Sequence, residues 1–107
     1  MNEKTNNEKL LLKALAGLYY VDDPEVGLNI VDLGLIYEIN FDEDKKLMKI
    51  IMTLTTQFCP MGDEITQNTM NSLTEDFPDW DVDLEMTFDP PWDQSKISPE
   101  GIEFLTQ

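Results

Sequence analysis

Cys59, the only cysteine of the chain, is the residue with the clearest capacity for chemistry. It lies in the stretch from Thr53 to Gly62, between a run typical of a strand and a run typical of a helix. Pro60 suits the first position of a helix, so Cys59 would be its N-cap. Free backbone N–H groups and the helix dipole favour the thiolate there. Such a sulfur could act as a nucleophile or a metal ligand; the structural alternative is a small buried apolar residue.

A thiol enzyme fits this sequence poorly. The chain has no histidine, the usual base beside a catalytic cysteine. Asp63 and Glu64 follow in the first turn of the expected helix, where they oppose ionisation of Cys59. One sulfur cannot form a closed zinc site, and the acids between Asp22 and Asp32 lack the spacing of an EF-hand calcium loop. We therefore expect no catalytic machinery and no stable metal or organic cofactor.

Composition indicates one acidic domain. The 107 residues carry a formal net charge of −15, from 22 Asp and Glu against 7 Lys. This length supports a single hydrophobic core, so we assign one domain to residues 1–107 with its core from about 5 to 101. Nucleic acid is a poor partner because phosphate contacts need clustered Lys or Arg. The apolar runs are too short to span a membrane, and a lone cysteine without a signal peptide predicts a cytoplasmic protein.

The hydrophobic pattern predicts an α/β (α+β) fold with the order helix, strand, strand, helix, strand. Thr5-Asn6-Asn7-Glu8 matches a capping box that would start the first helix with Thr5 as N-cap. The two central strands form a hairpin, and the crossover to the last strand implies a small mixed three-stranded sheet with helices packed on it. The elements are expected at residues 5–17, 35–41, 47–54, 60–75 and 80–88.

The last strand has the cleanest alternation. Asp81, Asp83 and Glu85 alternate with apolar residues, so one face would cover the core while the other meets solvent or a basic partner. This acidic face is a candidate partner surface, with plain solvation as the alternative.

The segment after that strand begins with Pro90-Pro91, which excludes a central strand and predicts a rigid extended segment. Trp92 could plug the edge of the core or lie near Cys59; both placements stay open. Ser98-Pro99 predicts the start of a last short helix, with Ser98 as its N-cap.

The connection at residues 22–34 carries acids together with apolar residues that would hold it against the domain. Asp23, Glu25 and Asp32 could face a functional site, because fixed loops often carry one. Turn-forming and capping roles are the alternative for these acids.

Four motifs of the chain occur together in one order and spacing. They are Asp23-Pro24-Glu25, Ile30 to Tyr37, Leu54-Thr55-Thr56 with Cys59-Pro60, and Pro90-Pro91-Trp92 with Ile97-Ser98. Over about residues 10–101 the chain thereby resembles the family that includes the bacterial SufT and PaaD proteins. The absence of the cysteine-rich C-terminal segment of PaaD-like proteins favours the compact, single-domain SufT-like branch.

The resemblance implies a role in the maturation of iron-sulfur proteins, through cluster assembly or transfer to client apoproteins, and an α/β fold. In that family the cysteine that corresponds to Cys59 is regarded as functionally important. The resemblance implies that Asp23, Thr55 and Thr56 line the same region, and we expect Glu25, Asp32 and Pro60 to line it as well.

A single thiol limits how such a protein could handle a cluster. Clusters are usually held by four thiolates or by thiolates with imidazoles, and this chain offers one thiolate and no imidazole. We therefore expect Cys59 to be a transient ligand, with the others supplied by a second subunit, a small thiol, Asp23 or the client.

The alternative function is a metal-free adapter that presents clients to the assembly machinery. It would use the acidic strand face and Trp92 as its partner surface. Under both functions the expected partners are iron-sulfur client proteins and the cluster assembly machinery, and a homodimer is left open.

Overall fold

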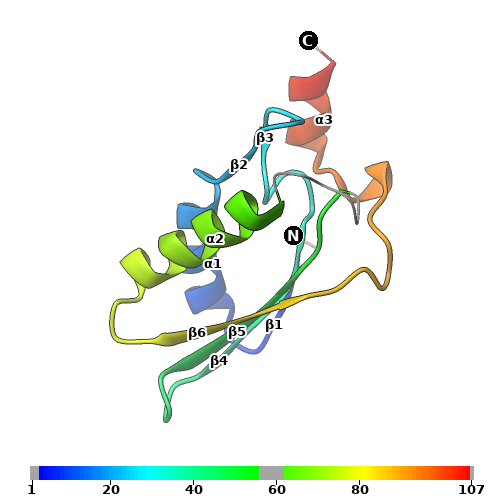
Figure 1. Cartoon of the computed structure of the whole chain (residues 1–107). Coiled ribbons are helices and arrows are strands. Elements are labelled where there is room, and N and C mark those ends of the chain that lie inside the picture. Colours follow the sequence, from blue (N-terminus) through cyan, green and yellow to red (C-terminus); the bar gives the residue numbers. More distant parts are fainter. Residues whose placement is uncertain (1–2, 56–61, 107) are drawn as a thin grey trace.

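A four-stranded mixed sheet forms the centre of the computed structural model, which describes residues 3–55 and 62–106 (Figure 1). The strand order is β1-β4-β5-β6. β4 and β5 are antiparallel, while β1 pairs with β4, and β6 with β5, in parallel. The expected hairpin and crossover are thus confirmed, whereas the expected three-stranded sheet gains a fourth strand. The strands span Lys4–Thr5 (β1), Ile36–Asp42 (β4), Leu47–Met52 (β5) and Asp81–Met86 (β6).

The N-terminal segment runs along β4 before the first helix begins. Thr5 belongs to β1, and the side chain of Asn6 exchanges two hydrogen bonds of 2.9 Å with the backbone of Phe41. Asn7 is the N-cap, because its side chain accepts from the Leu10 N–H at 3.1 Å. The capping box with Thr5 as N-cap is therefore wrong: the free edge of β4 recruits this segment as a strand instead.

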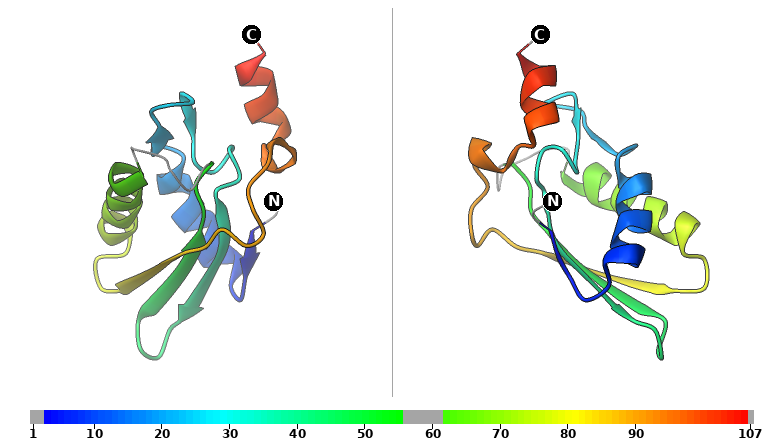
Figure 2. Two further views of the ribbon diagram at one scale, coloured as in Figure 1. Left: turned by 45° about the vertical axis from the view of Figure 1, so that its right-hand side comes forward. Right: turned by 180° about the vertical axis from the view of Figure 1, so that it is seen from behind.

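The helices α1 (Glu8–Leu18) and α2 (Gly62–Asp76) lie on the same face of the sheet (Figure 2). Their buried residues recur at helical spacing, as expected from the sequence. The start of α2 expected at Pro60 lies outside the described residues. The side chains that the helices bury are Leu11, Ala14, Leu15, Leu18, Ile65, Thr69 and Leu73, and those of the sheet include Ile39, Phe41, Met48, Ile50 and Met52.

A bulge interrupts the alternation of β4. Ile36 pairs with Met52 and Glu38 with Ile51, which leaves Tyr37 as the extra residue on its strand. A bulge re-aims side chains relative to a regular strand. Tyr37 accordingly lines a groove on the helix-free face, together with Glu38 and Ile51.

The connection before β4 is held against the domain, as expected from its apolar residues. β2 (Asp22–Asp23) and β3 (Leu28–Asn29) form a small antiparallel ribbon. Ile30 and Leu33, which follow the ribbon, are completely buried. The backbone that carries the acids of this connection is therefore held against the domain.

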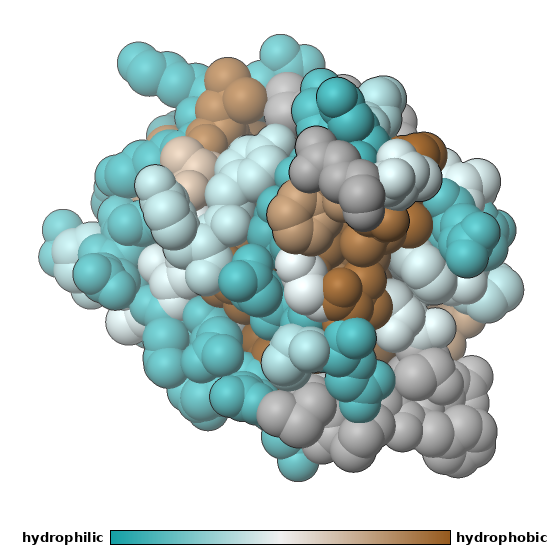
Figure 3. Space-filling view, turned by 90° about the horizontal axis from the view of Figure 1, so that it is seen from above, coloured by the Kyte–Doolittle hydropathy of each residue, from teal (hydrophilic) through white to brown (hydrophobic). Residues whose placement is uncertain are grey.

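The C-terminal segment leaves β6 without regular structure, as expected from its prolines, and continues through a short 3-10 helix, η1 (Gln94–Lys96), into α3 (Pro99–Leu105). Ser98 is the N-cap of α3, which confirms that prediction. Ile102, Phe104 and Leu105 remain between 41% and 53% exposed. Apolar side chains are accordingly visible on this end of the molecule in Figure 3.

Candidate functional site

Asp23 is the expected site residue with the most unusual surroundings. It is completely buried in β2, and its Oδ1 accepts a hydrogen bond of 2.9 Å from the backbone N–H of Glu25. Its Oδ2 is also buried and has no hydrogen-bond partner among the described residues. A buried polar oxygen without a donor is unfavourable for folding. This oxygen is therefore available to a donor or a cation from outside the described fold.

Asp32 holds the C-terminal segment to the loop before β4. Its carboxylate accepts hydrogen bonds of 2.8 Å from the Asn29 side-chain amide and from the Ser98 hydroxyl. Its carbonyl oxygen accepts from the Ser98 N–H at 2.7 Å. Both carboxylate oxygens are thus engaged within the fold, and Asp32 ties the loop before β4 to Ser98, the N-cap of α3.

The remaining expected site residues lie in or beside the connection between β5 and α2. Thr55 is half-buried in a bend shortly after the end of β5. Cys59, Thr56 and Pro60 lie outside the described residues. Among the described site residues, Asp23 bonds only to the backbone N–H of Glu25, which is itself exposed, and Asp32 is placed separately with Ser98.

The acids of β6 lie where the alternation predicts. Asp81, Asp83 and Glu85 are exposed on the face opposite the helices, while the residues between them pack against the core. Glu85 Oε1 lies 3.7 Å from Lys49 Nζ, with both side chains about half exposed. An ion pair this exposed contributes little to stability, so the carboxylate remains open to other partners.

Trp92 lies at the edge of the core, the first of the two placements that the sequence left open; the second, near Cys59, involves a residue outside the described part of the chain. The Trp92 side chain packs against the core, and its indole N–H donates to the Leu33 carbonyl at 2.7 Å. Trp92 thus fixes the C-terminal segment beside the loop that precedes β4.

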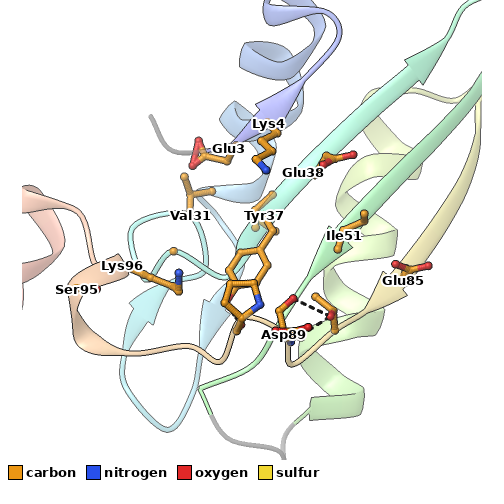
Figure 4. A pocket seen from close by; sticks show the side chains of 14 residues that line it. Glu3, Lys4, Val31, Tyr37, Glu38, Ile51, Glu85, Asp89, Ser95 and Lys96 are labelled. Carbon is orange, nitrogen blue, oxygen red and sulfur yellow. Dashed lines mark hydrogen bonds between the residues drawn. The ribbon is translucent and has the colours of Figure 1, made fainter.

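The helix-free face of the sheet carries a groove of about 590 Å³ (Figure 4). One row of residues, in register across the four strands, crosses its floor. The C-terminal segment forms a wall, and Glu3, directly before β1, closes the other side. The row consists of Lys4, Glu38, Ile51 and Glu85, and the surrounding residues include Glu3, Tyr37, Asp89, Pro90, Ser95 and Lys96.

Tyr37 connects the floor of the groove to its wall. Its hydroxyl donates to the Pro90 carbonyl at 2.8 Å, and Lys96 Nζ lies 5.1 Å from the centroid of its ring. Burial raises the pKa of Tyr37, which keeps the phenol protonated as a donor. Gly34 has a φ of +79°, and a Cβ there would lie 2.2 Å from the Lys96 carbonyl oxygen. Only glycine lets the wall approach this closely.

The groove was not found by sequence reasoning. The acidic alternation pointed to Glu85, but Glu3, Glu38 and Lys96 come from three further segments, and their proximity depends on β1 and on the path of the C-terminal segment. The one local signal was the position of Glu38 on the solvent face of a predicted strand.

Within residues 3–55 and 62–106, no three His, Cys, Asp or Glu side chains gather closely enough to hold a metal ion. No helix in the same part of the chain is long and apolar enough to cross a bilayer.

Comparison with known proteins gives a consistent result. Residues 13–87 match the model of a family described as iron-sulfur cluster assembly protein. The chain is 38% identical over 92 residues to the Fe-S protein maturation auxiliary factor YitW of Bacillus subtilis, which covers 85% of this chain and 88% of that protein. It is also 38% identical over 78 residues to the Fe-S protein maturation auxiliary factor SufT of Staphylococcus aureus, covering 73% of this chain and 88% of the relative.

The fold is shared with a solved structure. A domain of unknown function from Bacillus anthracis superposes with a TM-score of 0.86 at 32% sequence identity, covering 92% of this chain and 93% of that one. The expected mixed α/β architecture is therefore confirmed by a related structure as well as by the strand pairing.

Proposed function

Because the chain belongs to the family of iron-sulfur cluster assembly proteins, we propose that it is a non-enzymatic auxiliary factor in the maturation of iron-sulfur proteins. It would act in the cytoplasm and assist cluster assembly or transfer to client apoproteins. The observation that carries this proposal is the 38% identity to two proteins named as maturation auxiliary factors, over most of the length of both.

The chemistry of the chain supports Cys59 as a transient ligand of the cluster, which is cargo. One thiol without any imidazole cannot complete the ligand set of a cluster, so other ligands must come from Asp23, a client, a small thiol or a second subunit. Incomplete ligation suits a carrier that has to release what it carries.

Asp23 is the residue of this chain best suited to assist. Its buried Oδ2, which lacks a donor among the described residues, could bind iron or accept a hydrogen bond from a ligand of the cluster. A carboxylate is a weaker partner for iron in a cluster than a thiolate, which again favours release over storage.

The alternative function, a metal-free adapter for clients, is favoured by a different observation. Asp81, Asp83 and Glu85 all lie exposed on β6, at the edge of the sheet. Exposed like charges attract a basic partner surface and raise the rate of association. In this function Cys59 would have no chemical role.

The experiment that separates the two functions uses cells that lack the protein. Aconitase activity, which depends on an iron-sulfur cluster, is measured after complementation with wild type, Cys59→Ser, or a charge-reversed variant (Asp81→Lys, Asp83→Lys, Glu85→Lys). We expect Cys59→Ser to leave aconitase activity at the level of the deletion strain, because serine removes the ligand while keeping its shape. We expect the charge-reversed variant to restore most of the activity.

Equal abundance of the variants, checked by immunoblot, is the control for folding. Full rescue by Cys59→Ser together with failure of the charge-reversed variant would replace the transient-ligand function with the adapter function. A deletion strain with normal aconitase activity would remove the basis for both.

A further inference from the structure

We propose that the groove on the helix-free face is a binding site for an extended, basic peptide segment of a partner protein. The proposal goes beyond the maturation function, because the groove would bind such a segment whether or not Cys59 ligates a cluster. Its volume of about 590 Å³ lies within the range of specific ligand sites.

The charge of the groove favours a cationic occupant. Four carboxylates line it, against two lysines. Lys96 already lies over the ring of Tyr37, so Lys4 is the one remaining cation among the described residues that line the groove. Charge complementarity therefore points to lysine or arginine side chains. The four acids are Glu3, Glu38, Glu85 and Asp89 (Figure 4).

Glu3 provides an independent reason for a donor at this place. Its Oε1 is buried and has no hydrogen-bond partner among the described residues. A buried carboxylate oxygen without a donor destabilises the free protein, so a Lys or Arg N–H that reaches it would gain a charge-assisted hydrogen bond. Glu38 lies on the neighbouring strand in the row that includes Lys4, so two carboxylates flank this end of the groove (Figure 4).

The apolar lining favours an extended segment over a lone cation. Ile51 is half-buried at the centre of the floor, and Val31 and Pro90 border it together with the ring of Tyr37. In an extended chain, alternate side chains point to opposite sides. A segment with interspersed apolar and basic residues can therefore cover Ile51 and present its cations to the acids.

A second copy of this chain is a poor occupant. The chain carries a formal net charge of −15, with only 7 basic residues, so two copies repel each other. A basic segment of another protein is attracted by the same field.

The test uses a defined probe, the fluorescein-labelled peptide Gly-Lys-Val-Arg-Val-Lys-Gly, and its acidic counterpart Gly-Glu-Val-Glu-Val-Glu-Gly. Fluorescence anisotropy with the full chain at physiological ionic strength, where exposed charges are screened beyond about 8 Å, gives the affinity. We expect binding of the basic peptide only. In a two-dimensional NMR titration the backbone amide signals of Glu38, Ile51 and Ser95 should shift most.

Two variants with the same change of charge locate the site. Glu3→Gln with Glu38→Gln alters the groove, whereas Glu43→Gln with Asp44→Asn alters exposed acids of the turn between β4 and β5 that do not line it. We expect the first pair to weaken binding about tenfold or more, as for loss of a charge-assisted hydrogen bond, and the second to weaken it less than about twofold. Thermal unfolding of both variants verifies that they are folded.

Three outcomes would overturn the proposal. The first is no binding of the basic peptide, and the second is an equal loss of affinity in the two variants, which would indicate a diffuse acidic surface. The third is self-association through the groove, seen as a dimer of the wild type in sedimentation velocity that Glu3→Gln with Glu38→Gln converts to a monomer.

Discussion

The two faces of the central sheet are made from alternate residues of the same strands, yet they have different surroundings. Ile50 of β5 points to α1 and α2 and is completely buried, while its neighbour Ile51 lies half-buried in the floor of the groove. On the helix-covered face the row through Ile50 continues with Ile39 and Leu84. On the open face the row through Ile51 is flanked by acids.

The faces also differ in how their polar groups are satisfied. On the covered side, the buried hydroxyl of Thr69 donates to the Ile65 carbonyl at 2.8 Å. On the open side, Glu3 Oε1 has no partner within the described residues. A satisfied buried hydroxyl such as that of Thr69 costs the fold nothing, whereas an unsatisfied carboxylate oxygen in the groove can gain free energy from a ligand. One set of strands thus provides both the core of the fold and the open face on which we propose that a peptide binds.

The largest effect is expected from matched alanine substitutions at the two neighbouring isoleucines. Ile50→Ala leaves a cavity under the helices and should lower the free energy of unfolding by about 3 to 4 kcal/mol. Ile51→Ala, on the open face, should lower it by about 1 kcal/mol. Urea denaturation followed by circular dichroism measures both. Equal losses would contradict the assignment of one covered and one open face.

A smaller effect is expected where the wall of the groove is fastened. Ser98 caps α3 by accepting from the Gly101 N–H at 3.0 Å and donates to Asp32. Ser98→Ala should therefore lower the stability of this region by about 1 to 2 kcal/mol. Hydrogen exchange at Gly101 should speed up, and the basic peptide should bind more weakly because the wall is less well held.

Thr106→Ala is the matched control for Ser98→Ala. Thr106 is the exposed C-cap of the same helix, so the loss of its hydroxyl group should change the free energy of unfolding by less than about 0.5 kcal/mol. If both variants bind the peptide like the wild type, the shape of the groove does not depend on the contact between Ser98 and Asp32.

The sequence predicted the parts of the fold that depend on local pattern. The alternation of β6, the buried faces of α1 and α2, and the N-cap Ser98 all follow from residues close together in the chain, and all are confirmed. The motifs of the sequence also indicate the family, and the match over residues 13–87 confirms it.

The features that sequence reasoning missed depend on contacts between distant segments. The local sequence predicts Thr5 as a helix cap, because no nearby residue indicates that the edge of β4 is free to pair with the segment around Thr5. The bulge at Tyr37 is set by pairing with β5, and the groove needs the C-terminal segment to return beside β4. For the site itself, the structure describes Asp23, Glu25, Asp32 and Thr55, while the proposed role of Cys59 stays a prediction.

The smallest effect on stability is expected at Tyr37, and this effect depends on pH. Tyr37→Phe removes the hydrogen bond to the Pro90 carbonyl and should lower stability by about 0.5 to 1 kcal/mol at neutral pH. Tyr20→Phe, at an 89% exposed position, is the control and should change it by no more than a few tenths of a kcal/mol.

Because burial raises the pKa of Tyr37 in the folded protein, the unfolded chain loses this proton first as the pH rises through about 10. The contribution of Tyr37 to stability is therefore fully present below that pH and declines above it. The pKa of Tyr19 is raised too, chiefly by burial, so some alkaline destabilisation should persist in Tyr37→Phe. Urea denaturation of the three proteins at neutral and alkaline pH measures the difference. The free energy of unfolding of Tyr37→Phe could instead fall with pH as steeply as that of the wild type and of Tyr20→Phe. The Tyr37 phenol would then be a solvated group and not the link between the floor and the wall of the groove.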